Sequence, residues 1–271
     1  MENFKECTFI NLMRMLLCAL LGLIPALLKV GPTGLSLTGE AFPVYLLAGI
    51  SMSTFCLAWM YAYQNEAYMF LSIFTMLGTI ITCILDGVIY HTVIRLTQWI
   101  GMAVLLLAVY IMSVYNKGIK GRLTGKGILI LIIGTLGSAV ADFSQKLYVR
   151  QIGQSAEVFN FYMYAFGFVL LLLVYLLSLR RRQLPKTAPK LYDKQHMGIY
   201  FAMSLFLYIN SFTKTMAAAF LPAAQIYPVL QGANLIFSAL MAHFLFREKM
   251  NLKGFLGIIT AFAGLMILHL L

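Results

Sequence analysis

Charged residues are scarce in this sequence, and long polar stretches are few. Only 11% of the residues are Asp, Glu, Lys or Arg, whereas 61% are hydrophobic. A soluble globular domain has about one quarter charged residues and an apolar share nearer one half. The composition therefore excludes a soluble domain and predicts a helical protein that crosses the membrane several times. A closed barrel is not favoured, since the apolar runs are continuous and too long for its alternating strands.

Acidic residues are the scarcer of the charged groups. The chain has 9 Asp and Glu against 20 Lys and Arg, which gives a formal net charge of +11. A surface for nucleic acid needs its basic residues on one folded face, whereas here they lie mainly in short segments between apolar runs. We therefore expect no nucleic-acid partner.

Residue patterns that carry catalysis or bind metals are missing as well. The chain has no phosphate-binding glycine loop, no HExxH and no nucleophile elbow, so we expect neither an enzyme nor a bound cofactor. The cysteines have neither paired nor metal-ligand spacing, so we predict no disulfide and no metal site. They are Cys7, Cys18, Cys56 and Cys83.

Nine apolar runs are present instead, and each is long enough to cross about 30 Å of hydrocarbon at about 1.5 Å per helical residue. The sequence therefore predicts an all-α fold, a polytopic membrane bundle of nine transmembrane helices. The expected spans cover about residues 9–29, 43–63, 67–90, 94–115, 127–149, 156–179, 197–219, 222–245 and 252–271.

Basic residues between the spans indicate how the chain is oriented. Most of them fall on one side of the membrane, including the clusters at 117–126, 180–194 and 247–253. The positive-inside rule assigns that side to the cytoplasm, which puts the N-terminus inside and the C-terminus outside. We expect a multi-pass protein of the bacterial plasma (inner) membrane.

The sequence also repeats itself. At an offset of 156 residues, Gly101 falls on Gly257 and Trp99 on Phe255, and the third span falls on the eighth. Equivalent spans are five helices apart, an odd number, so the two repeats must have opposite orientations, as in many secondary transporters. We predict a first unit of four helices at 1–116 and a second of five at 117–271. The first unit then lacks its first helix.

Polar residues cluster in the span at 222–245. Pro228 should bend this helix and leave the Ala224 carbonyl without its partner. Lipid cannot satisfy amides or a carbonyl, so such groups must face protein or a water-filled cavity. Hydrogen bonds between helices are the alternative role. The predicted cavity residues of this class are Gln225, Tyr227, Gln231, Asn234, Asn210, Tyr208, Trp59 and Tyr63.

Ionisable residues inside the spans form a second group of candidates. Lys214 must find a cavity, a carboxylate or an anionic ligand, or else extend towards an interface. Arg14 either reaches the headgroups or holds an anionic group of a substrate. Asp142 and Lys146, the candidate coupling residues, are four residues apart, which permits a silent ion pair. The alternative is that Asp142 is a proton-coupling carboxylate, and a pair of Asp142 with Lys214 instead would titrate during transport. Asp86 is expected at the membrane interface.

Three segments together resemble a known family. They are LPAAQIYPVLQG at 221–232, FREKMNLKGFLGIITAFAGLMIL at 246–268 and NLMRMLL at 11–17, and they are similar to the EamA-type branch of the drug/metabolite transporter superfamily. The resemblance implies two inverted units of five helices that carry metabolites, amino acids or drugs through a central cavity. This sequence departs from that pattern with nine predicted spans and an external C-terminus. A misplaced gene start or a natural short form would explain the missing helix.

Two functions follow from these observations. The first is a secondary transporter that moves a small organic metabolite or drug by alternating access. Its partners would be the small-molecule substrate and the lipid bilayer. The sequence leaves open whether the protein forms a homodimer. The alternative is a non-transporting membrane accessory protein or a truncated relative, because a missing helix would leave the cavity open to lipid.

Overall fold

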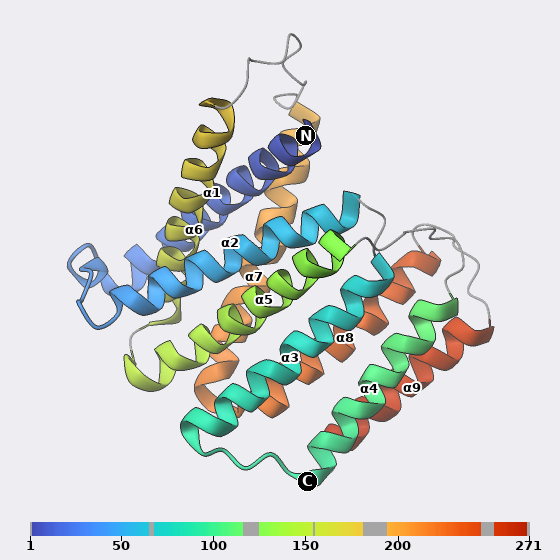
Figure 1. The fold of residues 1–271 in the computed structure, drawn as a ribbon. Coiled ribbons are helices and arrows are strands. Elements are labelled where there is room, and N and C mark those ends of the chain that lie inside the picture. The colour runs from blue at the N-terminus through green and yellow to red at the C-terminus, as the bar shows by residue number, and fades with distance from the viewer. Residues whose placement is uncertain are drawn as a thin grey trace. The chain divides into compact units, whose positions relative to one another are not determined.

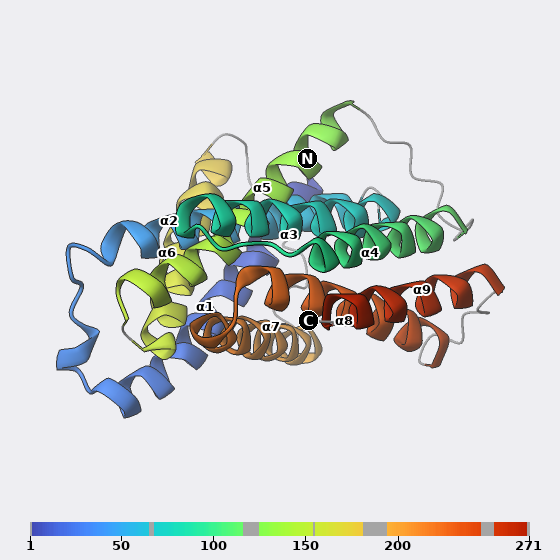
Figure 2. The ribbon, with the colours of Figure 1, turned by 90° about the horizontal axis from the view of Figure 1, so that it is seen from below.

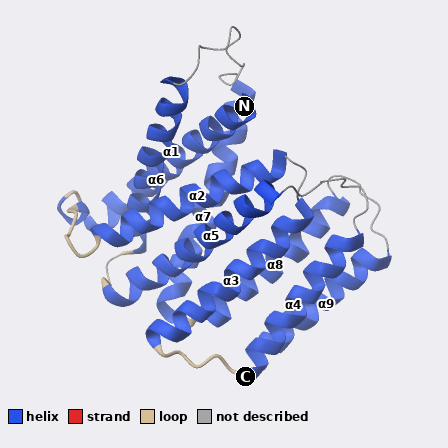
Figure 3. Ribbon diagram, in the orientation of Figure 1, coloured by secondary structure: helices blue, strands red, loops and turns tan. Residues whose placement is uncertain are grey.

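The computed structural model describes residues 2–64, 68–115, 125–153, 155–180, 194–244 and 252–269. Within these ranges the chain is helical and contains no strand (Figure 3). The all-α prediction is confirmed for this part of the chain. A helix satisfies its backbone N–H and C=O groups within its own segment except at the two ends, which is why apolar runs in lipid adopt it.

The helices coincide with the predicted apolar runs. The largest difference is at the N-terminus, where the first helix begins at Glu2 instead of near residue 9. Two prolines, Pro25 and Pro228, lie inside helices. The elements are α1 (Glu2–Val30), the 3₁₀ helix η1 (Thr33–Leu35), α2 (Phe42–Gln64), α3 (Tyr68–Tyr90), α4 (Leu96–Tyr115), α5 (Gly125–Gln151), α6 (Ala156–Arg180), α7 (Lys194–Phe220), α8 (Ala223–Phe244) and α9 (Leu252–His269).

Four of these helices are long and apolar enough to cross a membrane, judged by length and composition over the described residues. They contain the spans Cys7–Val30, Phe42–Tyr61, Gly125–Gln151 and Ala156–Ser178. Three further apolar stretches are shorter, at Phe74–Tyr90, Leu96–Ile111 and Phe255–Leu268. The prediction of nine crossings therefore stays a prediction.

The chain divides into two compact units by its own contacts. Unit 1 comprises Met1–Tyr61 and Ser144–Phe220, and unit 2 comprises Ala62–Phe143 and Leu221–Leu271. The boundary falls inside α5, between Phe143 and Ser144. Each unit thus takes helices from both halves of the chain. The predicted repeats, 1–116 and 117–271, are a different division, because they compare one half of the sequence with the other. They stay a prediction.

In unit 1, α1 packs against α6 and α7, and α2 packs against α6. Gly49 permits this second contact, because a Cβ at that position would lie 2.7 Å from Phe166 Cβ and 2.9 Å from the Gly167 amide nitrogen. Cβ atoms do not approach other atoms so closely, so a larger residue would push α2 away from α6.

In unit 2, α4 lies alongside α9 and α3 packs against α8. Figure 1 and Figure 2 both show α4 and α9 side by side. Met76, Met102, Leu105 and Ala261 belong to the apolar core between these helices. The closely packed pairs in the two units, α1 with α6, α3 with α8 and α4 with α9, join helices that the sequence repeat equates.

Candidate functional site

A chain of buried polar side chains links three helices inside unit 1. Gln145 on α5 donates from Nε2 to the hydroxyl of Ser211 on α7 at 3.3 Å. Ser211 donates to Oδ1 of Asn160 on α6 at 2.7 Å, and Asn160 Nδ2 donates to the Thr215 hydroxyl at 3.1 Å. All four side chains are at most 3% exposed. We call these four residues the unit 1 network.

The network is satisfied at one end and open at the other. Asn160 Nδ2 also donates to the Ala156 carbonyl at 2.8 Å, and Thr215 donates to the Ser211 carbonyl at 2.9 Å. Gln145 Oε1 is buried and finds no hydrogen-bond partner among the described residues. A buried acceptor without a partner is costly, so this oxygen can receive a donor from water or a ligand.

Lys146 is almost completely buried beside this network. Its side chain is 2% exposed, and Nζ donates to the carbonyl oxygen of Ala218 at 2.8 Å. Ala218 lies in the last turn of α7, where carbonyls have no partner within the helix and the helix dipole favours a cation. Lys146 therefore caps the C-terminal end of α7. Its pairing with Asp142 stays a prediction.

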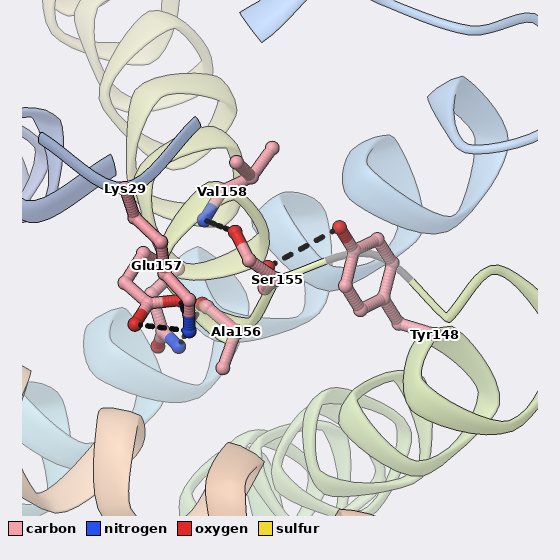
Figure 4. A network of polar contacts seen from close by, with 7 residues as sticks. Lys29, Tyr148, Ser155, Ala156, Glu157 and Val158 are labelled. Carbon is pink, nitrogen blue, oxygen red and sulfur yellow. Dashed lines mark hydrogen bonds and ion pairs between the residues drawn. The ribbon is translucent and has the colours of Figure 1, made fainter. Parts of the chain in front are cut away.

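An ion pair joins the end of α1 to the start of α6 (Figure 4). Lys29 Nζ lies 2.9 Å and 3.0 Å from the two carboxylate oxygens of Glu157. Lys29 is in the last turn of α1 and Glu157 in the first turn of α6, so each charge suits the dipole of its own helix. The Ser155 hydroxyl accepts from the Val158 amide at 3.4 Å and caps the same end of α6.

Arg14 lies on α1 and is half-buried. Its Nη1 donates to Oδ1 of Asn11 at 3.2 Å, whereas its Nε is buried without a hydrogen-bond partner in the described part of the chain. Asn11 is completely buried. The Asn11 Nδ2 donates to the Cys7 carbonyl at 3.0 Å and to the Cys56 carbonyl at 3.3 Å, so this amide joins α1 to α2 and orients the guanidinium.

In unit 2, Asp86 caps the helix that contains Pro228. Asp86 Oδ2 accepts from the Thr92 hydroxyl at 2.9 Å and from the backbone amide of Ala223, the first residue of α8, at 3.4 Å. A carboxylate is favoured at this end of a helix, where amides lack partners. Asp86 is 1% exposed. Its expected position at the membrane interface stays a prediction, and the structure adds that Asp86 is buried against α8.

Tyr227 also anchors α8. Its hydroxyl donates to the backbone carbonyl of Asp142 at 2.6 Å, and its side chain is 1% exposed. The neighbouring amides differ in exposure: Gln225 and Gln231 are half-buried, whereas Asn234 is exposed. The bend expected at Pro228 stays a prediction.

The structure divides the predicted site residues between the two units. Arg14, Trp59, Lys146, Tyr208, Asn210 and Lys214 belong to unit 1, and Asp142, Gln225, Tyr227, Gln231 and Asn234 belong to unit 2. The side chain of Tyr63 lies outside the described residues. The roles of these residues in binding and coupling therefore stay predictions.

Sequence reasoning missed the unit 1 network and Asn11. A signal was present, because each of these residues is polar and lies within an apolar run. Asn11 also stands three residues before Arg14, a spacing that puts both on one helix face.

Apolar helices with polar side chains hydrogen-bonded across their interior define a helical integral membrane protein. Residues 3–114 and 125–270 match the model of the EamA-like transporter family, in two stretches that cover nearly the whole chain. The chain therefore belongs to the EamA-like transporter family of membrane transporters, and the resemblance seen in its sequence is confirmed. A search of curated proteins finds no match.

Proposed function

We propose that this protein is a secondary transporter that moves a small organic solute across the membrane by alternating access. Membership of a transporter family supports transport. The observation that carries the proposal is the unit 1 network, in which side chains from α5, α6 and α7 bond one another, and both α5 and α6 are long and apolar enough to cross a membrane. Buried polar residues in such helices are costly and commonly mark substrate pathways.

The chemistry of the network suits a site that binds and releases a ligand. A hydroxyl can donate or accept, so Ser211 and Thr215 can exchange a bond within the network for a bond to a solute. Gln145 Oε1 adds an acceptor that has no partner among the described residues. Asn210 and Lys214 lie next to Ser211 and Thr215 on α7 and would extend the site along the helix.

Alternating access in this fold requires two related halves that rock around a central site. The family match in two stretches supports such a duplication. The pairing of α1 with α6 and of α3 with α8 supports it as well, since these helices are equivalent in the sequence repeat. The Pro228 residue in α8 and the pair Asp142 and Lys146 would then serve as bend and coupling groups.

Flux through proteoliposomes containing the full chain tests the proposal. The panel is a set of labelled amino acids, nucleosides, and mono- and dicarboxylic acids. We expect flux above that of empty liposomes for at least one solute. The variant N160A should reduce this flux about tenfold or more, because it removes bonds to Ser211 and Thr215 at once.

The matched control is Thr54→Ala, since the Thr54 hydroxyl bonds the Ile50 carbonyl of its own helix at 2.8 Å. This variant should transport like the wild type. A folded protein that moves no solute of the panel would favour the alternative, a non-transporting membrane component. Equal flux in N160A and wild type would show that the unit 1 network does not take part in transport.

A further inference from the structure

Arg14 is a permanent cation inside a membrane-spanning segment. It lies on α1 within the apolar span Cys7–Val30. A guanidinium stays protonated at any physiological pH, so it cannot lower the cost of its position by losing its proton. Within a span, such a charge needs an anion, a carbonyl or water.

In the described part of the chain, the partners of Arg14 are neutral. Arg14 makes no ion pair with a carboxylate of the described residues, and its one hydrogen bond there goes to the amide oxygen of Asn11. The thiols of Cys18 and Cys56 and the phenol of Tyr164 also lie within electrostatic range of Arg14. Among the described residues, neutral groups of this kind do not compensate the positive charge of Arg14.

A position at the headgroups does not explain this arrangement. A guanidinium that extends to the interface is solvated by water and phosphates, whereas Arg14 Nε is buried. Its Nη1 is bonded to Asn11, which is 0% exposed and is itself fixed by the carbonyls of Cys7 and Cys56. Asn11 therefore holds the guanidinium towards the interior of unit 1.

We propose that Arg14 binds a carboxylate, or an equivalent planar oxyanion, of the transported solute. This inference rests on the proposed transport function and specifies the chemical class of its substrate. A carboxylate has two oxygens that match the fork of a guanidinium and supplies the missing negative charge. Asn11 acts as the positioning residue, because it occupies Nη1 and leaves the other donors of the guanidinium to the ligand.

Thermal unfolding of the purified full chain in detergent tests the inference with matched pairs of acids and amides. The probes are benzoate and benzamide, phenylacetate and phenylacetamide, and glutamate and glutamine. We expect at least one acid to raise the melting temperature, and its amide to have little effect. Arg14→Gln should weaken binding of that acid about tenfold or more.

Two further variants separate binding from folding. Arg14→Lys keeps the charge but loses the fork, so it should bind the acid with intermediate affinity. Arg95→Gln is the matched control, since Arg95 is an exposed residue just before α4 and should leave acid binding unchanged. If Arg14→Gln does not fold, the comparison of wild type with Arg14→Lys still decides, because equal binding by both would contradict recognition by the fork.

Three results would overturn the inference: no acid stabilises the wild type, amides act as well as acids, or Arg14→Gln binds the acid as tightly as wild type. Phosphatidylglycerol could instead raise the melting temperature of the wild type but not of Arg14→Gln, while no acid raises it. That result would assign the site to a lipid phosphate and would also overturn the inference. If any of these results is obtained and proteoliposomes still show flux of a neutral solute, the inference about Arg14 fails while the transport proposal holds.

Discussion

The two units differ in the hydrogen-bond partners of their buried polar side chains. In unit 2, threonine hydroxyls bond backbone carbonyls, as Thr79 does with the Thr75 carbonyl at 3.2 Å and Thr135 with the Leu131 carbonyl at 2.8 Å. In unit 1, side chains bond one another across helices, as Ser211 does with Asn160 at 2.7 Å.

This difference has consequences for rigidity. A hydroxyl bonded to its own helix, as that of Thr79 is, stays satisfied wherever that helix moves and places little constraint on helix packing. Thr82 and Thr135 each add a bond to a backbone carbonyl of the neighbouring helix, at 3.2 Å and 3.3 Å. The bonds of the unit 1 network hold only while α5, α6 and α7 keep their places. Unit 2 also has close apolar contacts between helices, such as that between Gly101 on α4 and Leu268 on α9.

The largest effect should come from filling the close contact in unit 2. A Cβ on Gly101 would lie 2.6 Å from Leu268 Cγ and 3.1 Å from the Gly264 carbonyl oxygen. Gly101→Leu should therefore force α4 away from α9 and lower stability by about 1–3 kcal/mol or more. The measurement is the melting temperature of the purified protein in detergent.

Gly198→Leu is the control for this prediction, because a Cβ on Gly198 on α7 would meet no atom within 4 Å. Its melting temperature should stay close to that of the wild type. Equal losses in the two variants would show that the bulk of leucine, and not the contact between α4 and α9, is responsible.

A second pair of substitutions compares the two kinds of hydrogen bond directly. Asn160→Leu removes an amide that bonds Ser211 and Thr215 across helices, and it should cost about 1–3 kcal/mol, because the Ser211 hydroxyl loses its acceptor. Thr79→Val removes a hydroxyl bonded to its own helix and should cost about 0.6 kcal/mol or less. The two losses are compared by melting temperature. A larger loss for Thr79→Val would contradict the contrast drawn between the units.

The helices could be predicted from the sequence because lipid leaves an apolar run only one way to satisfy its backbone. The family could be predicted because two of the three segments that resemble it, at 221–232 and 246–268, lie close together in the sequence, and the family match confirms it. The sequence repeat indicates which helices are equivalent, but it does not predict that equivalent helices pack against each other. That α1 packs on α6 and α4 on α9 depends on long-range contacts such as that of Gly101 with Leu268.

The site was harder to predict because its contacts join distant segments. Spacing within α5 predicts a pair of Asp142 with Lys146, but it gives no sign that Lys146 Nζ bonds the carbonyl of Ala218, 72 residues away. Asp86 likewise caps a helix that begins 137 residues later. Arg14 could be selected from its charge alone, but its fixed orientation depends on the bond from Asn11 to the Cys56 carbonyl on α2.

The smallest effect should come from the ion pair at the edge of unit 1. Lys29 is half-exposed, with 50% of its side chain accessible, while Glu157 is 10% accessible. Water and salt screen such a pair, so Lys29→Gln should cost about 0–1 kcal/mol, and less as salt is added. The measurement is the melting temperature at low and high salt. A large loss that salt does not reduce would show that the pair fixes α1 to α6 as firmly as the unit 1 network joins α6 to α7.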